Sequence, residues 1–262
     1  MQEGRDCVKI AASDFDGTLH LKGEGICQET LAAIKRWQEA GNKFGLVTGR
    51  NLHLVRLGLE PYEIRLDFCV ALNGAVAYDA EERQLCGADM PQDAIRELWG
   101  HTIARESPYV MALQGDGTFV KWNDPEWEDP LRHVGIPEVT PEEAQEIPHV
   151  MQMCFAASSP ERAEELARDL NARFAGVLVA EVNLFYVDVC SGGNDKGTGL
   201  ANLQECMGWE SHPLYVIGDD LNDVSMIQRF HGFAMERGNP QARKMASRVF
   251  PSVGTMLDAM LE

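Results

Sequence analysis

The sequence contains few basic residues. It has 23 lysines and arginines against 41 aspartates and glutamates, which gives a formal net charge of −18. Nucleic acids and anionic membranes bind basic surfaces, so this balance argues against both as partners. An anionic substrate would also be repelled at long range, and a site for one needs local positive charge from a metal ion or a lysine.

The sequence also lacks paired cysteines and long apolar runs. Its 7 cysteines are an odd number and none forms a CxxC pair, which argues against a zinc site and against a disulfide framework. Free thiols in a reducing cytosol are the simpler interpretation. No apolar run approaches membrane-spanning length, and residues 1–6 carry no apolar segment typical of a signal peptide. We therefore expect a cytoplasmic protein.

What the sequence does contain is typical of a globular protein. Its 262 residues, 45% hydrophobic and 24% charged, suffice for one large or two modest domains. Apolar segments predict strands at 8–12, 43–47 and 68–72. Between the first two, Leu31, Ile34 and Trp37 recur at helical spacing, which predicts a helix over residues 28–40. Strands that alternate with helices predict a parallel sheet.

The pattern changes at about residue 80 and returns at about residue 190. The intervening stretch predicts helices and antiparallel hairpins, with loops over the proline-rich residues 124–148. One helix is predicted over residues 91–104, and later helices at 199–207 and 221–230. We therefore predict an α/β fold in which residues 1–79 and 190–262 form a Rossmann-like, doubly wound parallel sheet, with an α+β cap inserted at residues 80–189.

Two acidic residues follow the first predicted strand. Asp14 and Asp16 stand two residues apart, and Gly17 lets the backbone bend after them. Ligands bind at the carboxyl ends of strands in an open α/β sheet. Two carboxylates there suit a hard cation, or one can attack a phosphoryl group while the other handles protons. The same residues are also typical of a simple turn.

Three further polar clusters stand at predicted strand ends or helix starts: Thr48-Gly49, Lys196, and Asp219-Asp220-Leu221-Asn222-Asp223. Each alone has an ordinary explanation as a turn, a solvated lysine or a helix-start acid. As an ordered set along one sheet they fit phosphoryl transfer. Asp14 and Asp219 would hold a divalent metal, and the other groups would hold phosphate oxygens.

The same motifs resemble the haloacid dehalogenase superfamily. They are Asp-Phe-Asp-Gly-Thr-Leu (14–19), Val-Thr-Gly-Arg (47–50), Asp-Lys-Gly (195–197) and Gly-Asp-Asp-Leu-Asn-Asp (218–223). The chain is similar in particular to the Cof-like phosphatases, which carry a large α/β cap after the third core strand. Two more segments, Asn73-Gly74-Ala75 and Gly238-Asn239-Pro240, also resemble that branch, the second with proline for alanine.

This resemblance implies a Mg²⁺-dependent phosphatase of a small phosphorylated metabolite, either a sugar phosphate or a phosphorylated cofactor. Asp14 would be the nucleophile that becomes an aspartyl-phosphate, and Asp16 would protonate the leaving alcohol and then activate water. The metal would bind Asp14, Asp16 through its main chain, and Asp219, with support from Asp223.

The resemblance also implies how phosphate is held. Thr48, Gly49 and Asn222 would contact the phosphate, and Lys196 would steady both the phosphate and the nucleophile. Residues 191–195 depart from the usual approach to this lysine. They do not form a P-loop, because Lys196 precedes its glycine. No cap residue can be assigned a role from the sequence.

Three other functions remain open from the sequence. A phosphomutase of the same superfamily would use the same residues. A signalling receiver module also places acids, a threonine and a lysine at strand ends, but such a module is about half this length and has no inserted cap. A non-catalytic binding protein is disfavoured by the complete catalytic set.

Overall fold

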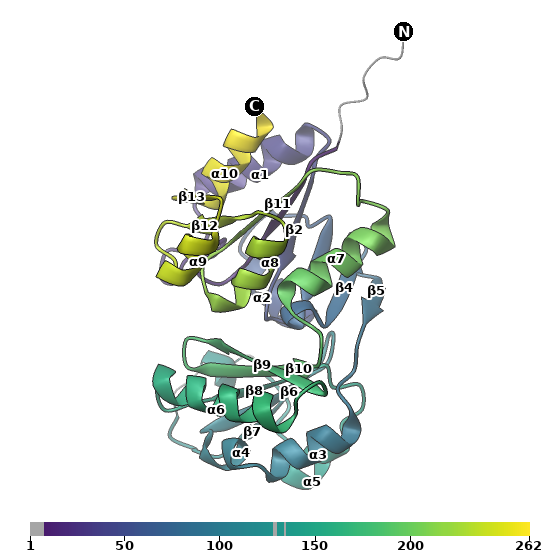
Figure 1. Ribbon diagram of the computed structural model, residues 1–262, viewed down its shortest axis with the longest axis vertical. Coiled ribbons are helices and arrows are strands. Elements are labelled where there is room, and N and C mark those ends of the chain that lie inside the picture. Colours follow the sequence, from purple (N-terminus) through teal and green to yellow (C-terminus); the bar gives the residue numbers. More distant parts are fainter. Residues whose placement is uncertain (1–7, 128–129, 134) are drawn as a thin grey trace.

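The computed structural model describes residues 8–127, 130–133 and 135–262, which form two sheets with their helices, one unit above the other in Figure 1. Residues 1–6, where a signal peptide was not expected, and Cys7 lie outside the described residues. None of the described cysteines forms a disulfide bond. Within this part of the chain no helix has both the length and the apolar character needed to cross a bilayer.

The larger sheet has eight strands and forms the core. From β13 through β3 all neighbouring strands run parallel, whereas β4 and β5 extend the edge in antiparallel fashion. The strands, in sheet order, are β13 (Arg248–Phe250), β12 (Phe233–Met235), β11 (Leu214–Gly218), β1 (Ile10–Ser13), β2 (Lys43–Val47), β3 (Phe68–Ala71), β4 (Val76–Asp79) and β5 (Gln84–Gly87).

Helices cover both faces of this sheet, which explains why β1 is apolar throughout. Ala11 packs in the cluster of α1 (Gln28–Glu39), α2 (Leu52–Leu59) and α10 (Val253–Leu261). Ile10 and Ala12 pack on the opposite face, against α7 (Lys196–Met207) and α8 (Val224–Arg229). The helix α9 (Pro240–Met245) packs beside α8. The predicted doubly wound α/β core is thereby confirmed.

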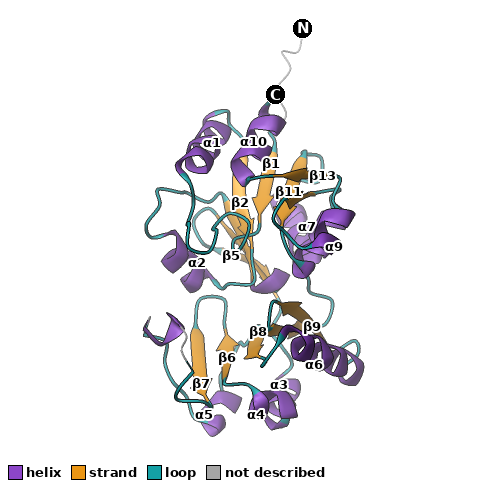
Figure 2. Ribbon diagram, turned by 90° about the vertical axis from the view of Figure 1, so that its left-hand side faces the viewer, coloured by secondary structure: helices purple, strands orange, loops and turns teal. Residues whose placement is uncertain are grey.

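The smaller sheet forms the cap. It is antiparallel, in the order β7-β6-β8-β10-β9, and its helices lie on the side away from the core (Figure 2). Its elements are α3 (Gln92–Gly100), α4 (Thr102–Glu106), β6 (Tyr109–Leu113), β7 (Thr118–Trp122), the 3₁₀ helix η2 (Pro130–His133), α5 (Pro141–Gln145), β8 (Gln152–Ala156), α6 (Pro160–Arg173), β9 (Leu178–Asn183) and β10 (Tyr186–Ser191).

Some predicted elements differ from the observed ones. The helix predicted over residues 91–104 is two helices, because His101 has an extended backbone and its Nδ1 accepts a hydrogen bond from the Ile103 amide. The helix predicted at residue 199 begins three residues earlier, where the Asp195 side chain accepts from the Thr198 amide. The helix predicted from residue 221 begins as a 3₁₀ turn, η3 (Leu221–Asp223).

The pairing of the strands bears on the boundaries of the cap, which the sequence analysis places at residues 80 and 189. In the core sheet β4 pairs with β3, and β5, which falls in the predicted cap, pairs with β4. Strand β10 stays in the cap sheet to Ser191. We propose that the core extends to residue 87 and resumes after residue 191. The antiparallel edge was missed because such short strands carry little periodicity.

The backbones of the turn η1 (Leu72–Gly74) and the start of α7 approach each other closely. Gly74 has φ +95°, and a Cβ there would overlap the carbonyl oxygen of Asp195. This close approach places Lys196, the first residue of α7, beside the carboxyl end of the core sheet.

We expect Gly74→Ala to destabilise the fold more than Gly41→Ala does. Both glycines have positive φ, but a Cβ at Gly41 meets nothing within 4 Å. The control should lose roughly 1–2 kcal/mol from backbone strain alone, and Gly74→Ala should lose about 1–3 kcal/mol more from overlap. Urea unfolding of both variants measures the difference, and equal losses would contradict the packing described.

Candidate active site

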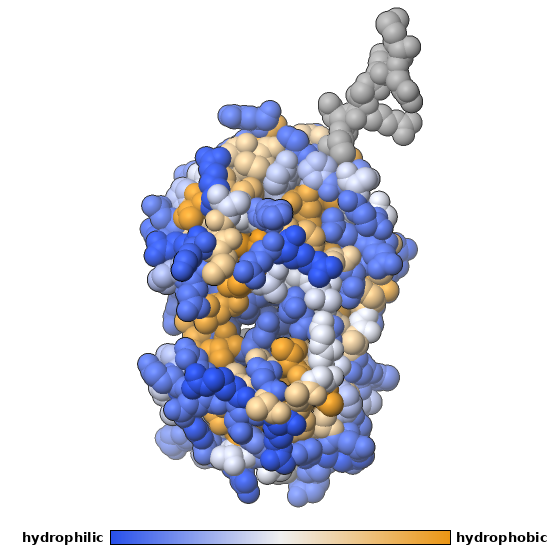
Figure 3. Space-filling view, in the orientation of Figure 1, coloured by the Kyte–Doolittle hydropathy of each residue, from blue (hydrophilic) through white to orange (hydrophobic). Residues whose placement is uncertain are grey.

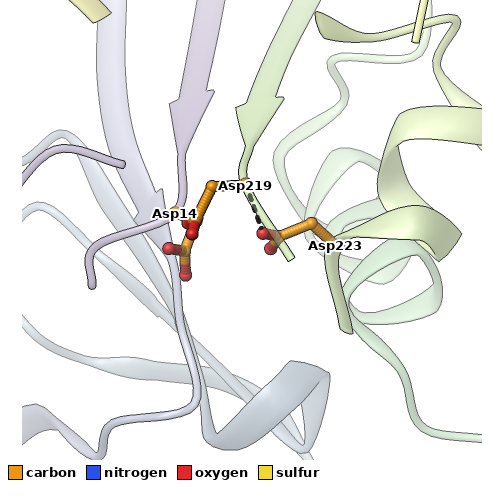
Figure 4. A group of neighbouring side chains, drawn as sticks. All are labelled: Asp14, Asp219 and Asp223. Carbon is orange, nitrogen blue, oxygen red and sulfur yellow. Dashed lines mark hydrogen bonds between the residues drawn. The ribbon is translucent and has the colours of Figure 1, made fainter. Parts of the chain in front are cut away.

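Three neighbouring strands of the core sheet end at the same place. In the sheet β11 lies beside β1 and β1 beside β2, all parallel. Asp219 follows β11, Asp14 follows β1 and Thr48 follows β2. Parallel strands carry their carboxyl ends to one edge, so these side chains come together there as the sequence predicted. Figure 4 shows Asp14 and Asp219 side by side, with Asp223 facing them.

Lys196 lies buried between two of these carboxylates. Its Nζ donates to Asp14 Oδ1 and to Asp223 Oδ1, each at 2.6 Å, and its side chain is 1% exposed. Burial lowers the pKa of Lys196, but attraction to Asp14 and Asp223 outweighs burial and raises it above the usual value. The lysine is therefore charged. Its removal would leave two carboxylates facing each other without a counter-charge.

Asp223 also fixes the loop that carries Asp219. Its Oδ2 accepts from the backbone amides of Asp219, at 2.8 Å, and Asp220, at 3.0 Å. A Cβ at Gly218 would overlap the Asp223 carboxyl group, so the glycine is needed for the loop to close. Both oxygens of Asp223 are therefore used in holding Lys196 and the loop.

Asp14, Asp219 and Asp223 offer oxygen atoms that lie within 4.8 Å of one another. Burial raises the pKa of Asp14 well above its usual range, and burial raises that of Asp219 to about 6. A bound cation would stabilise the charged form of both carboxylates and so lower both pKa values. A donor set made only of oxygens suits a hard divalent ion. Gly17 leaves the space open, because a Cβ there would overlap the Asp219 carboxylate. The residues present therefore fit a metal, with Asp14 and Asp219 the carboxylates that retain free oxygens.

Asp16 does not join this three-carboxylate group through its side chain. Its two oxygens accept from Arg50 Nε and Nη2, each at 2.7 Å, on an exposed part of the site. The Arg50 guanidinium in turn lies 4.6 Å from the ring centre of Phe15. Arg50 belongs to the Val-Thr-Gly-Arg segment (47–50), but the sequence analysis assigned it no role. Its pairing with Asp16 becomes visible only in the folded structure.

The predicted phosphate contacts line the same edge. The Thr48 hydroxyl is buried and accepts from the Arg50 amide at 3.1 Å. The Gly49 carbonyl accepts from Gln152 of the cap at 3.2 Å. Asn222 Nδ2 donates to Asn73 Oδ1 at 3.2 Å. Each group thus has a fixed orientation around the Asp14–Lys196 pair.

A family model described as haloacid dehalogenase-like hydrolase matches residues 11–255. The chain belongs to this family. The predicted membership of the haloacid dehalogenase superfamily is thereby confirmed. The fold also matches that of a HAD/COF-like hydrolase from Plasmodium vivax, with a TM-score of 0.83. The two chains are 21% identical, and the match covers 98% of this chain and 97% of that one. A sugar phosphatase of HAD subclass IIB has the same fold, with a TM-score of 0.80 at 20% identity, covering 97% of this chain and 99% of that one.

Curated relatives of this hydrolase are named as phosphatases. An HMP-PP phosphatase from Serratia proteamaculans (strain 568) is 26% identical over 250 residues, covering 90% of this chain and 87% of the relative. The pyridoxal phosphate phosphatase YbhA of Escherichia coli (strain K12) is 27% identical over 246 residues, covering 84% and 85%. These names agree with the predicted enzyme class, a hydrolase of phosphoric monoesters.

The site also contains residues to which the sequence analysis assigned no role. Asn73, at φ +49°, donates from Nδ2 to Asp188 Oδ2 at 2.9 Å and to Gln152 Oε1 at 3.2 Å, both in the cap. The sequence signal for this residue is the Asn73-Gly74 pair, because asparagine and glycine are the residues that adopt positive φ most readily. Asp188 lies inside a strand, where nothing in the sequence distinguishes it.

Glu181 on β9 is a second unassigned acid near the site. It lines a cavity of about 700 Å³ between cap and core, together with Arg168, Asn171, Asn222, Asn239 and Gln241. The space-filling view is hollowed at this waist between the two units (Figure 3). Burial raises the pKa of Glu181 to about 8, against the opposing attraction of Lys196; Asp195, Asp188 and Asp223 raise it further.

Replacing Glu181 by glutamine should flatten the pH dependence of stability. In metal-free protein the folded state keeps a proton on Glu181 up to pH of about 8, whereas the usual value is 4.5, so stability falls as pH rises between these values. We expect the wild type to lose roughly 2 kcal/mol more than Glu181→Gln between pH 5.5 and 8. Urea unfolding in EDTA measures this.

A matched control variant tests whether the change in pH dependence is specific to Glu181. Glu165→Gln removes an exposed acid of the helix α6 and should retain the wild-type slope. A Glu181→Gln slope equal to that of the wild type would show that Glu181 is ionised like a solvated carboxylate.

Proposed function

We propose that this hydrolase is a Mg²⁺-dependent phosphatase that releases phosphate from a small phosphorylated metabolite through an aspartyl-phosphate. The observation that carries the proposal is the buried Asp14–Lys196–Asp223 arrangement beside Asp219, at the carboxyl edge of the parallel sheet. A carboxylate in that position can attack phosphorus while fixed positive charge offsets its repulsion from the phosphate.

Asp14 is the proposed nucleophile. Its Oδ1 accepts from Lys196, which leaves Oδ2 to form the bond to phosphorus as the ester P–O bond breaks. Asp16 gives a proton to the departing alkoxide. It then takes a proton from the water that attacks the phosphorus of the aspartyl-phosphate, which frees inorganic phosphate and restores the Asp14 carboxylate.

The remaining groups hold the phosphoryl oxygens. Lys196 Nζ lies between the nucleophile and Asp223, where it can follow the charge that moves onto the phosphate. The Thr48 hydroxyl, the Gly49 amide and the Asn222 side chain amide surround the same edge. Their contacts to Arg50, Gln152 and Asn73 orient them before substrate binds.

Mg²⁺ is the proposed metal, held by Asp14, Asp219 and the main chain of Asp16. When bound, it supplies Lewis-acid charge to the phosphate. Asp223 supports this set by fixing the loop of Asp219. The Thr18 hydroxyl donates to Asp219 Oδ1 at 2.6 Å and leaves Oδ2 toward the open space at Gly17.

A small metabolite fits the cavity between cap and core. Its volume of about 700 Å³ lies within the range of small-molecule sites, roughly 300–1,000 Å³. The relatives named as HMP-PP and pyridoxal phosphate phosphatases support phosphorylated cofactors or their precursors as the substrate class.

The proposal is tested by phosphate release from a panel of phosphorylated metabolites, with Mg²⁺ and with EDTA. We expect metal-dependent release, and a loss of at least about 10³-fold in kcat for Asp14→Asn because the nucleophile is removed. Circular dichroism of the variant checks that it folds. Release that persists in Asp14→Asn would refute the mechanism, and no release by folded wild-type protein would refute the phosphatase.

Arg50→Lys should impair protonation of the leaving group. Lysine cannot reproduce the two-pronged pairing that holds Asp16. We expect kcat to fall about tenfold, within the contribution of acid–base catalysis, for alkyl phosphates, and to fall less for p-nitrophenyl phosphate, whose leaving group departs without a proton. Arg56→Lys, which alters an exposed pair with Glu82 and Asp116, is the matched control. Equal losses of kcat on both esters would show that Arg50 does not position Asp16 for proton transfer.

A further inference from the structure

Glu181 lines the cavity and carries a buried oxygen that is unsatisfied. Its Oε2 is buried and has no hydrogen-bond partner among the residues that the structure describes. On β9 its neighbours Ala180 and Val182 pack with α6 inside the cap, whereas Val179 packs toward the core. Because side chains alternate along a strand, Glu181 shares the core-facing side with Val179. The orphaned oxygen therefore belongs to the side of the cap that covers the site.

A second carboxylate stands directly opposite Glu181 on the neighbouring strand. Glu181 and Asp188 are register partners in the antiparallel pair of β9 and β10, so both side chains emerge on the same face. Asp188 accepts from Asn73 and lies close to Gly49, because a Cβ at Gly49 would meet Asp188 Oδ2 at 3.3 Å. Like charges in opposite positions destabilise a sheet. Asp188 is satisfied by the core, and Glu181 is left without a partner.

Glu181 shares its cavity with one of the proposed phosphate contacts. Asn222, next to Asp223, lines the same cavity as Glu181. A phosphate placed at Lys196 would therefore direct the rest of its ester toward the cap and Glu181. An unpaired buried carboxylate is unfavourable, so Glu181 keeps its proton in the empty protein. A positively charged group in the cavity would favour the ionised carboxylate, because it would offset both the lost hydration and the repulsion from Asp188.

We infer that Glu181 selects substrates whose leaving group carries a cationic or N–H donor nitrogen, which binds to its free Oε2. This inference rests on the proposed phosphatase function and assigns the part of the substrate that the cap recognises. The site then binds the two ends of the substrate with opposite charges. Lys196 and the bound metal contact the phosphate, and Glu181 in the cap contacts the nitrogen.

The test compares esters that differ only in this donor. Glucosamine 6-phosphate is paired with glucose 6-phosphate, and ethanolamine phosphate with 2-hydroxyethyl phosphate. In the pair that wild-type enzyme hydrolyses best, we expect kcat/KM to favour the amine by at least about tenfold, the worth of one charge-assisted hydrogen bond. Glu181→Leu should bring this ratio close to one, and Glu181→Gln should lower it strongly because the charge is lost.

The controls separate this inference from the proposed function. Glu165→Gln, which removes an exposed acid of the same cap, should keep the wild-type ratio. A ratio near one in the wild type, or a Glu181→Leu variant that loses activity on amine and hydroxyl esters alike, would overturn the inference while the phosphatase stands. Release from p-nitrophenyl phosphate but from no amine ester would overturn it too. A wild type inactive on every ester would remove the proposed function and the inference together.

Discussion

The buried ammonium group of Lys196 is the interaction on which the site depends. It joins Asp14, which follows the first core strand, to Asp223, which begins the helix after β11. Two carboxylates buried this deeply would repel each other and resist ionisation without it. Because Asp223 in turn holds the backbone of Asp219, one charged side chain fixes the nucleophile and the loop of the metal ligands.

The path of the chain ties this lysine to the cap. Strand β10 ends at Ser191 and α7 begins at Lys196, so only a short segment separates the cap sheet from the centre of the site. Away from this segment, Asn73 of the core bonds to Asp188 and Gln152 of the cap and accepts from Asn222 of the core. The segment before Lys196 and the contacts of Asn73 therefore join the cap to residues at the phosphate edge, which couples the position of the cap to the geometry of the site.

The sequence predicted the core strands and the position of the site correctly where a buried apolar strand ends in polar residues. The continuous run of β1 predicted a strand covered on both faces, and the clusters after β1, β2 and β11 meet because parallel strands share an edge. The edge strands β4 and β5 and the break at His101 were not predicted. The two strands result from the pairing of β4 with β3 and of β5 with β4, and the break results from a local backbone turn; neither leaves a periodic pattern in the sequence.

The sequence by itself determined the fold class, the family and the residues expected to carry the chemistry, because those residues stand at fixed spacings within short motifs. Tertiary structure alone decided which of them touch. It paired Asp16 with Arg50, placed Lys196 between Asp14 and Asp223, and brought Asp188 and Glu181 of the cap over the site. These contacts join residues from distant parts of the chain, and hydrogen-bond partners at such separations depend on packing, which no local pattern encodes.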